Sequence, residues 1–188
     1  MIAKHTNKPQ ALDTCPENCI EVGGYALNEP AILFFHQDDT TKVVGYRRPE
    51  DLDEKRRAAL SSHLNCPLDE VEAFTYDEHR FEAESEEWLI FTDDEADKAA
   101  REDIIECLWA FRPEFLSDYM PDGVTSDIIQ TMQAKLCEDA QPAFKAMLGG
   151  QVRIVVRDAM SADGRGHFLA SYDGEEIEEM DLFMFRVD

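Results

Sequence analysis

One acidic segment, Asp69 to Glu106, constrains this chain more than any other feature. It holds 16 Asp or Glu residues and only three basic residues, so its net charge is −13, more than half of the chain's −23. Most of these carboxylates must stay at the surface, because a buried charge is costly unless it is paired. The overall charge also argues against direct binding to DNA, RNA or an anionic membrane, since phosphate would be repelled.

The acidic segment has an internal order that predicts a strand. Glu82, Glu84 and Glu86 recur at every second position, so an extended chain would present all three on one face. The next four residues, Trp88 to Phe91, are apolar and are typical of a short buried strand. We therefore expect an acidic strand whose carboxylates are exposed.

An acidic helix is predicted directly after this strand. Thr92 and Glu95 have the spacing of a capping box, in which the two side chains accept hydrogen bonds from backbone N–H groups of the first turn. The helix should run from about Asp93 to Phe111, because apolar residues recur there at helical spacing. The apolar residues of this stripe are Ala96, Ala100, Ile104, Leu108 and Phe111.

The remaining sequence predicts an α+β fold around this strand–helix unit. Two apolar runs form a β-hairpin, Pro49 begins a helix, and a later apolar stripe indicates a long helix that is kinked at Pro142. The C-terminal end predicts a second hairpin. The expected elements are strands at 31–36 and 42–47, helices at 49–64 and 126–148, and strands at 167–172 and 182–187.

Glycine pairs mark the expected breaks between elements. Gly23-Gly24 is interpreted as a flexible break, and Gly149-Gly150 as the end of the long helix. Residues 151–160 fit either a helix or a strand. The expected organisation is a flexible N-terminal arm at 1–19 and a single α+β domain at 20–188, with 20–85 and 86–188 as its two parts.

The cysteines and the apolar runs favour a cytoplasmic protein. Five cysteines are an odd and mostly scattered set, which indicates reduced thiols rather than a disulfide framework. Cys15 and Cys19 can supply half a zinc site, with His36 and Cys66 as further candidates, but a turn with two free thiols is the favoured interpretation. No apolar run has the length of a membrane-spanning helix, and the first residues lack the apolar region of a secretory signal.

Acidic residues near the C-terminal turn offer an alternative chemistry. Asp163, His167, Asp173, Glu175 and Glu176 carry the side chains of a Mg²⁺ or Mn²⁺ site in a nuclease-like enzyme. Carboxylates that gather on a turn are more often solvated, and we interpret the glycine-rich turn itself as structural. We therefore expect no metal, no other cofactor and no enzymatic activity.

Two stretches give the chain a resemblance to known sequences. Together they resemble a group of small uncharacterised proteins encoded by tailed phages and mobile elements, over roughly residues 86–188. The resemblance implies an origin in a mobile element and implies no activity. The stretches are Trp88 to Asp97 followed by Leu108 to Phe111, and Asp163 to Glu176 followed by Phe183 to Val187.

Ten acidic residues form the predicted partner-binding surface. Alternate residues of a strand lie about 6.6 Å apart, and successive phosphates of one DNA strand advance about 3.4 Å, so the strand glutamates can match every second phosphate. A protein with such a row can occupy the nucleic-acid channel of another protein. The predicted residues are Glu82, Glu84, Glu86, Glu87, Asp93, Asp94, Asp97, Glu102, Asp103 and Glu106.

The function expected from these features is binding, not catalysis. We expect a non-enzymatic protein that binds a basic host protein in the cytoplasm, with no direct contact to nucleic acid or membrane. Its most specific form is an anti-CRISPR or antirestriction inhibitor that acts as a DNA mimic on a nuclease. The alternatives are a metal-dependent enzyme with a site near 163–176, and a phage accessory protein of structural or regulatory role whose charge only keeps it soluble.

Overall fold

The computed structural model describes residues 9–188, and the first part of the expected N-terminal arm, residues 1–8, lies outside the described residues. The described chain is an α+β protein, as the sequence predicts. Contacts between residues divide it into two compact units. One unit runs up to Asp93 and includes Glu176–Asp188, and the other is Asp94–Glu175.

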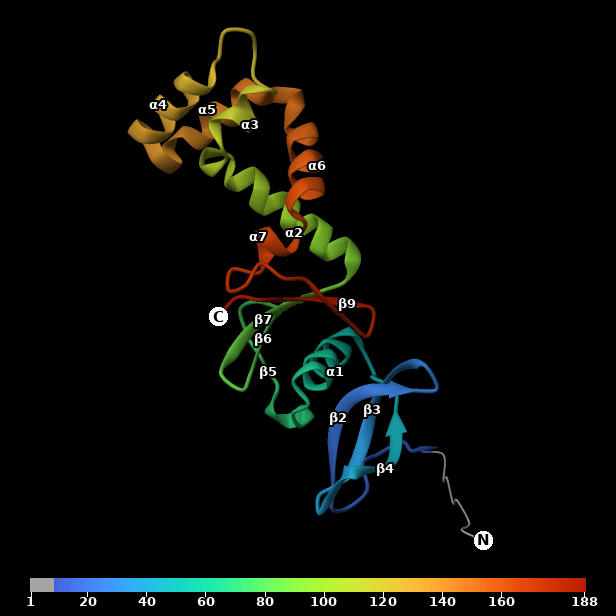
Figure 1. Cartoon of the computed structure of the whole chain (residues 1–188). Coiled ribbons are helices and arrows are strands. Elements are labelled where there is room, and N and C mark those ends of the chain that lie inside the picture. The colour runs from blue at the N-terminus through green and yellow to red at the C-terminus, as the bar shows by residue number, and fades with distance from the viewer. Residues whose placement is uncertain (1–8) are drawn as a thin grey trace. The chain divides into compact units, whose positions relative to one another are not determined.

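The first unit contains a four-stranded sheet with the order β1-β4-β3-β2 (Figure 1). Strand β1 is parallel to β4, and the other pairs are antiparallel. The expected hairpin at 31–36 and 42–47 is therefore present, but a strand that the sequence did not predict precedes it. The strands are β1 (Gln10–Ala11), β2 (Cys19–Ala26), β3 (Glu29–His36) and β4 (Asp39–Arg47).

The described part of the expected arm is attached to this sheet. Gln10 pairs with Gly45 in β4, and the backbone N–H of Leu12 donates a hydrogen bond to the carbonyl of Tyr46 at 2.8 Å. A Cβ atom at Gly45 would lie 2.4 Å from the Leu12 side chain, so glycine makes room for this segment. The expectation of a loose arm at 1–19 is therefore wrong for residues 10–12.

A helix packs closely on the unpredicted strand. A Cβ atom at Gly23 would lie 1.6 Å from the carbonyl oxygen of Ala58 in α1 (Leu52–Leu64), so only glycine fits at this crossing. The Gly23 N–H donates to the buried hydroxyl of Ser61, at 2.9 Å. Gly23-Gly24 is thus a strand interior that meets a helix, and the prediction of a flexible break is wrong.

Helix α1 begins at a well-formed cap. The Asp51 carboxylate accepts a hydrogen bond from the Glu54 N–H at 2.9 Å, and the Glu54 carboxylate reaches back to the Glu50 N–H at 2.6 Å. Asn65 ends the helix in the left-handed conformation, with φ of 55°. The helix predicted for residues 49–64 is confirmed and begins three residues later than its proline.

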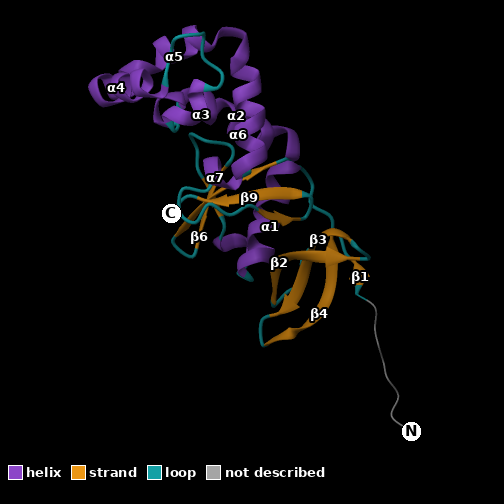
Figure 2. Cartoon of the chain, turned by 45° about the horizontal axis from the view of Figure 1, so that its top comes forward, coloured by secondary structure: helices purple, strands orange, loops and turns teal. Residues whose placement is uncertain are grey.

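A second sheet completes the first unit, with the order β5-β6-β7-β9-β8 and only antiparallel pairs. Figure 2 shows its strands apart from those of the first sheet, and α1 lies between the two sheets. The acidic strand β7 pairs directly with the C-terminal strand β9. The strands are β5 (Glu72–Ala73), β6 (Arg80–Ala83), β7 (Glu86–Phe91), β8 (Ile177–Glu179) and β9 (Leu182–Arg186).

The core of the first unit joins both sheets through α1. The helix buries Ala58, Ala59 and Leu60 in succession, which a helix does only when it is covered on more than one side. The same cluster includes apolar residues of β3, β6, β7 and β9, namely Ile32, Phe34, Phe81, Trp88, Ile90 and Met184.

The second unit is built from helices. As predicted, α2 (Asp93–Glu106) begins at Asp93 and buries Ala96, Ala100 and Ile104, but it ends five residues before Phe111. A chain of joined helical segments follows at Ser126–Asp163. Its α-helices are α4 (Ser126–Leu136), α5 (Gln141–Leu148) and α6 (Val152–Asp163), and the short helices α3 (Pro113–Ser117) and α7 (Gly166–Leu169) lie before and after it.

The long helix breaks at one position that the sequence indicated, Gly149, and at one that it did not, Cys137. It breaks at Cys137 and Gly149, where φ is positive, at 49° and 47°. Pro142 lies in the first turn of α5, where its missing N–H has no helical partner to lose. Gly149 ends α5 as predicted, but the chain then continues as α6, so residues 152–160 are helical.

The first strand of the C-terminal hairpin lies later in the sequence than predicted. Residues 167–172 were predicted to be a strand, but Gly166–Leu169 forms α7, and Phe168 stacks on Phe111 with ring centroids 6.3 Å apart. The hairpin itself is present, with β8 at Ile177–Glu179 as its first strand. Its turn, Met180-Asp181, has positive φ at both residues.

We predict that Gly23→Ala destabilises the protein by more than about 3 kcal/mol, because the new methyl group overlaps backbone atoms of α1 that cannot move independently. Gly150→Ala is the matched control, since nothing lies within 4 Å of a Cβ atom there. Urea unfolding measures both variants. Equal stability of the two would contradict the close crossing of β2 and α1.

Candidate protein-binding surface

A tight turn decides where the strand glutamates point. Glu84 and Ser85 connect β6 to β7 and both have positive φ, at 52° and 66°. Such a two-residue turn reverses the chain, so the period-two pattern does not continue from one strand to the next. The prediction that Glu82, Glu84 and Glu86 share one face of a single strand is therefore wrong.

Three glutamates line up across neighbouring strands on the outer face of the second sheet. Glu82 of β6 lies directly opposite Glu72 of β5 on one side and Glu87 of β7 on the other. Adjacent strands are about 4.8 Å apart, so the three carboxylates form a row perpendicular to the strands. We call Glu72, Glu82 and Glu87 the glutamate row.

The alternation of the strands explains the direction of the row. Phe81 and Ala83, the neighbours of Glu82 in β6, are buried, with 0% and 2% of their surfaces exposed. Successive side chains of a strand point to opposite faces, so Glu82 must point outward. The core packing of β6 therefore fixes the row at the surface.

Arginines neutralise two of the predicted glutamates. Glu86 lies on the inner face of β7, and its carboxylate pairs with Arg186 of β9 at 2.9 Å. Glu87 pairs with Arg80 at 2.9 Å, which leaves one end of the row compensated. Within residues 9–188 no ion pair involves the other two glutamates of this hairpin, so their charge is available to a partner.

The acids of α2 also divide into those that pair with basic side chains of the protein and those that are exposed to solvent. Asp97 lies between two arginines, Arg101 at 3.1 Å and Arg165 at 3.2 Å, and is thus used inside the protein. Glu102 lies 3.9 Å from Lys98 in an exposed pair, which is worth little in water. The other exposed acids predicted on this helix are Asp93, Asp94 and Glu106.

Asp103 is the one acid of the predicted set whose environment disfavours its charge. Burial, and secondarily the nearby carboxylate of Glu106, raise the pKa of Asp103 above its ordinary value of 3.8. A half-buried carboxylate is a poor contact for a basic partner. Asp103 is therefore a structural cost rather than an accessible part of the surface.

The residues of the alternative metal site are not brought together. Across residues 9–188 no group of three or more His, Cys, Asp or Glu side chains is arranged to hold a metal ion. His167 is exposed on α7, with its ring against Phe168 at 5.0 Å, and the Asp173 carboxylate accepts a hydrogen bond from the Glu175 N–H at 2.9 Å. The second contact is typical of a structural turn.

Three of the five thiols are poor candidates for a nucleophile. Burial, followed by the charge of Glu21, raises the pKa of the Cys15 thiol to about 11, so it is protonated at neutral pH. Burial also raises the pKa of Cys66 and Cys107. Thiolate chemistry at these three positions is therefore disfavoured.

The sequence identified the acidic surface but missed one member of its row. Glu72 belongs to a strand of only two residues, and the pairing of β5 with β6 leaves no periodic signal. Two of the arginines that neutralise acids of the predicted set are distant in sequence, Arg186 beside Glu86 and Arg165 beside Asp97. A count of charges could therefore locate the segment but not the acids that remain free.

Comparisons with family models, curated proteins and solved structures found no match to this chain. No helix of residues 9–188 combines the length and the apolar composition needed to cross a membrane.

We predict that two neighbouring glutamates respond in opposite directions to neutralisation. Glu82→Gln should raise the free energy of unfolding by about 0.2–1 kcal/mol, because like charges directly opposite in a sheet are destabilising. Glu86→Gln should lower it by about 0.5–1 kcal/mol, because the half-buried pair with Arg186 is lost. Denaturant unfolding at low salt measures both. Changes of the same sign would contradict the assigned faces.

We predict that Asp103→Asn stabilises the protein at pH 7. The raised pKa means that the folded protein favours the protonated acid, so Asp103 costs stability as the pH rises through and above its ordinary value of 3.8. The gain from Asn should vanish when the pH is lowered below 3.8, where the acid is protonated in both states. Exposed Asp139→Asn is the control. A gain that persists at low pH would show another cause.

Proposed function

We propose that this protein binds a basic surface of a partner protein through the glutamate row and the adjacent Glu84. The observation that carries the proposal is the direct opposition of three like charges, Glu72, Glu82 and Glu87, on paired strands. The opposition of like charges on paired strands lowers the stability of the fold. A cationic partner would remove the repulsion, so the cost in the free protein becomes a gain on binding.

The negative charge of the row is compensated by an arginine at one end only. Arg80 compensates the Glu87 end of the row, while the Glu72, Glu82 and Glu84 side is exposed. A partner would therefore meet a compact group of carboxylates around the turn between β6 and β7. Charges of this kind chiefly raise the rate and specificity of association, and are screened beyond about 8 Å at physiological salt.

The more specific form of the proposal is a DNA mimic that inhibits a nuclease of the host cytoplasm, such as a restriction or CRISPR enzyme. The resemblance to phage and mobile-element proteins motivates this form, because such elements benefit from blocking these enzymes. The row does not have the spacing of every second phosphate, since its charges lie on neighbouring strands about 4.8 Å apart. Recognition in this form rests on the density of charge in a site already built for phosphate.

We predict that neutralising the row abolishes partner binding while a matched change elsewhere does not. The row variant is Glu72→Gln, Glu82→Gln and Glu84→Gln. The control carries Glu114→Gln, Glu138→Gln and Asp139→Asn, which change the net charge equally at exposed positions of the second unit. Affinity capture from bacterial lysate, at about 0.05 M and about 0.5 M salt, compares them with the unmodified protein.

The captured partner then decides between the two forms of the proposal. Duplex DNA should displace the protein from the partner if both use one site, and high salt should weaken the complex steeply. A complex that DNA does not displace contradicts the DNA mimic and leaves a basic protein surface of another kind. Equal binding by the row variant and the control contradicts the proposal as a whole.

A further inference from the structure

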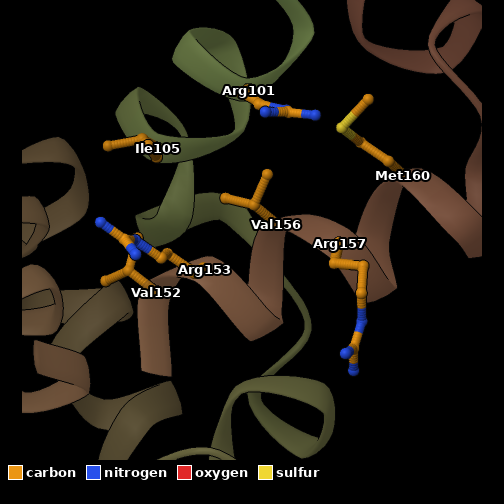
Figure 3. Close-up of a pocket in the computed structure, with 7 residues that line it drawn as sticks. All are labelled: Arg101, Ile105, Val152, Arg153, Val156, Arg157 and Met160. Atoms are coloured by element: carbon orange, nitrogen blue, oxygen red, sulfur yellow. The ribbon is translucent and has the colours of Figure 1, made fainter. Parts of the chain in front are cut away.

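The second unit contains a hollow whose lining carries positive charge, whereas the chain as a whole is negative. It has a volume of about 700 Å³ and lies between α2 and α6 (Figure 3). Its charged lining residues are three arginines, Arg101, Arg153 and Arg157. The unit around it holds 16 acidic residues against eight basic ones, so a lining with no carboxylate departs from its surroundings.

The rest of the lining is apolar. Ile105 projects from α2, and Val152, Val156 and Met160 lie one turn apart along α6. Figure 3 shows the Val156 side chain in the middle of this group, with Arg101 extending toward Met160. Methionine adapts its shape readily, so this floor can accept an apolar group of varied outline.

The three arginines are not equally available. Arg101 pairs with Asp97 at 3.1 Å on the same helix. Arg157 pairs with Asp158 at 2.7 Å, and in Figure 3 its guanidinium points away from the other lining residues. Within the described chain Arg153 has no ion pair, and it is exposed at the rim.

The placement of Arg153 is unfavourable without an anion. It lies four residues before Arg157 on α6, and like charges at this spacing destabilise a helix. Figure 3 shows Arg153 beside Val152, on the opposite side of the group from the end of Arg101, so an anion bound at Arg153 alone would offset this repulsion. The guanidinium fork suits a carboxylate or phosphate, because it donates two parallel hydrogen bonds to either group.

We infer that this hollow binds a small amphiphilic anion, with a carboxylate or phosphate head held by Arg153 and an apolar body on Ile105, Val156 and Met160. The volume lies within the range of small-molecule sites, about 300–1,000 Å³. A small monoanion fits better than an acidic peptide. The unit has eight more acidic than basic residues, and this charge repels a polyanion far more strongly.

The test uses simple probes of this chemistry on the full-length protein. Decanoate and decyl phosphate carry both features, decanol lacks the charged head, and inorganic phosphate lacks the apolar body. Titration calorimetry gives the dissociation constants, and amide chemical-shift changes locate the binding site. We expect at least one of the two amphiphilic anions to bind at least tenfold more tightly than decanol and inorganic phosphate, with shifts in α2 and α6. Comparison of decanoate with decyl phosphate identifies the head group.

Arginine variants test whether the anion binds in this hollow or is only attracted by the positive charge of any exposed arginine. Arg153→Gln should weaken the binding of the preferred anion at least tenfold. Arg112→Gln removes the same charge from an exposed arginine of this unit that does not line the hollow, and it should change the affinity less than twofold. The proposal is overturned if decanol binds as tightly as decanoate and decyl phosphate, if Arg153→Gln binds normally, if Arg112→Gln loses as much, or if neither anion binds at millimolar concentration.

Discussion

The first unit depends on one helix that is buried against two sheets. Small residues of α1 allow β2 to approach so closely that Gly23 touches the backbone at Ala58, and the opposite side of the helix packs on Phe81 and Trp88. Because the inner face of the second sheet is occupied in this way, the alternate residues of β6 and β7 must face outward. The position of the glutamates is thus a consequence of core packing, and they cannot retreat from one another without a loss of the core.

This arrangement separates acids that serve the fold from acids that only cost it stability. The Arg47 guanidinium binds Glu54 through two hydrogen bonds of 2.9 and 2.7 Å and also contacts Glu21 at 2.9 Å, and it lowers the pKa of Glu54. Asp97 is held between Arg101 and Arg165 in the other unit. Such pairs account for part of the acidic composition, whereas Glu72 and Glu82, which form no ion pair within residues 9–188, need another explanation. A binding function supplies one.

The sequence predicted most elements whose signal is local and periodic. The start of α2, the stripe of Ala96, Ala100 and Ile104, and the hairpin of β3 and β4 all follow from spacing within one segment. The predictions failed where a distant contact or an unusual turn decides the structure. Gly23-Gly24 resembles a break until α1 is placed on it, and Gly166–Leu169 becomes helical although its composition suits a strand.

Turn chemistry explains the largest error in the candidate site. Each of three hairpins in the first unit turns at two residues with positive φ, yet none has the Asn-Gly or Asp-Gly pair that usually marks such a turn. These turns are Leu27-Asn28, Glu84-Ser85 and Met180-Asp181. Without a turn signal the acidic segment is predicted to be one strand, so the glutamates at every second position are predicted to share one face. The charge of the surface was predictable, and its geometry was not.

The central claim is that the glutamate row is an energetically coupled unit held at the surface against its own repulsion. A double-mutant cycle at Glu72 and Glu82 tests it most directly, with unfolding free energies of the unmodified protein, Glu72→Gln, Glu82→Gln and the double variant at low salt. The account predicts that each single change stabilises the protein and that the double variant gains less than the sum, because both remove the same repulsion. Single changes that destabilise, or gains that simply add, would contradict it.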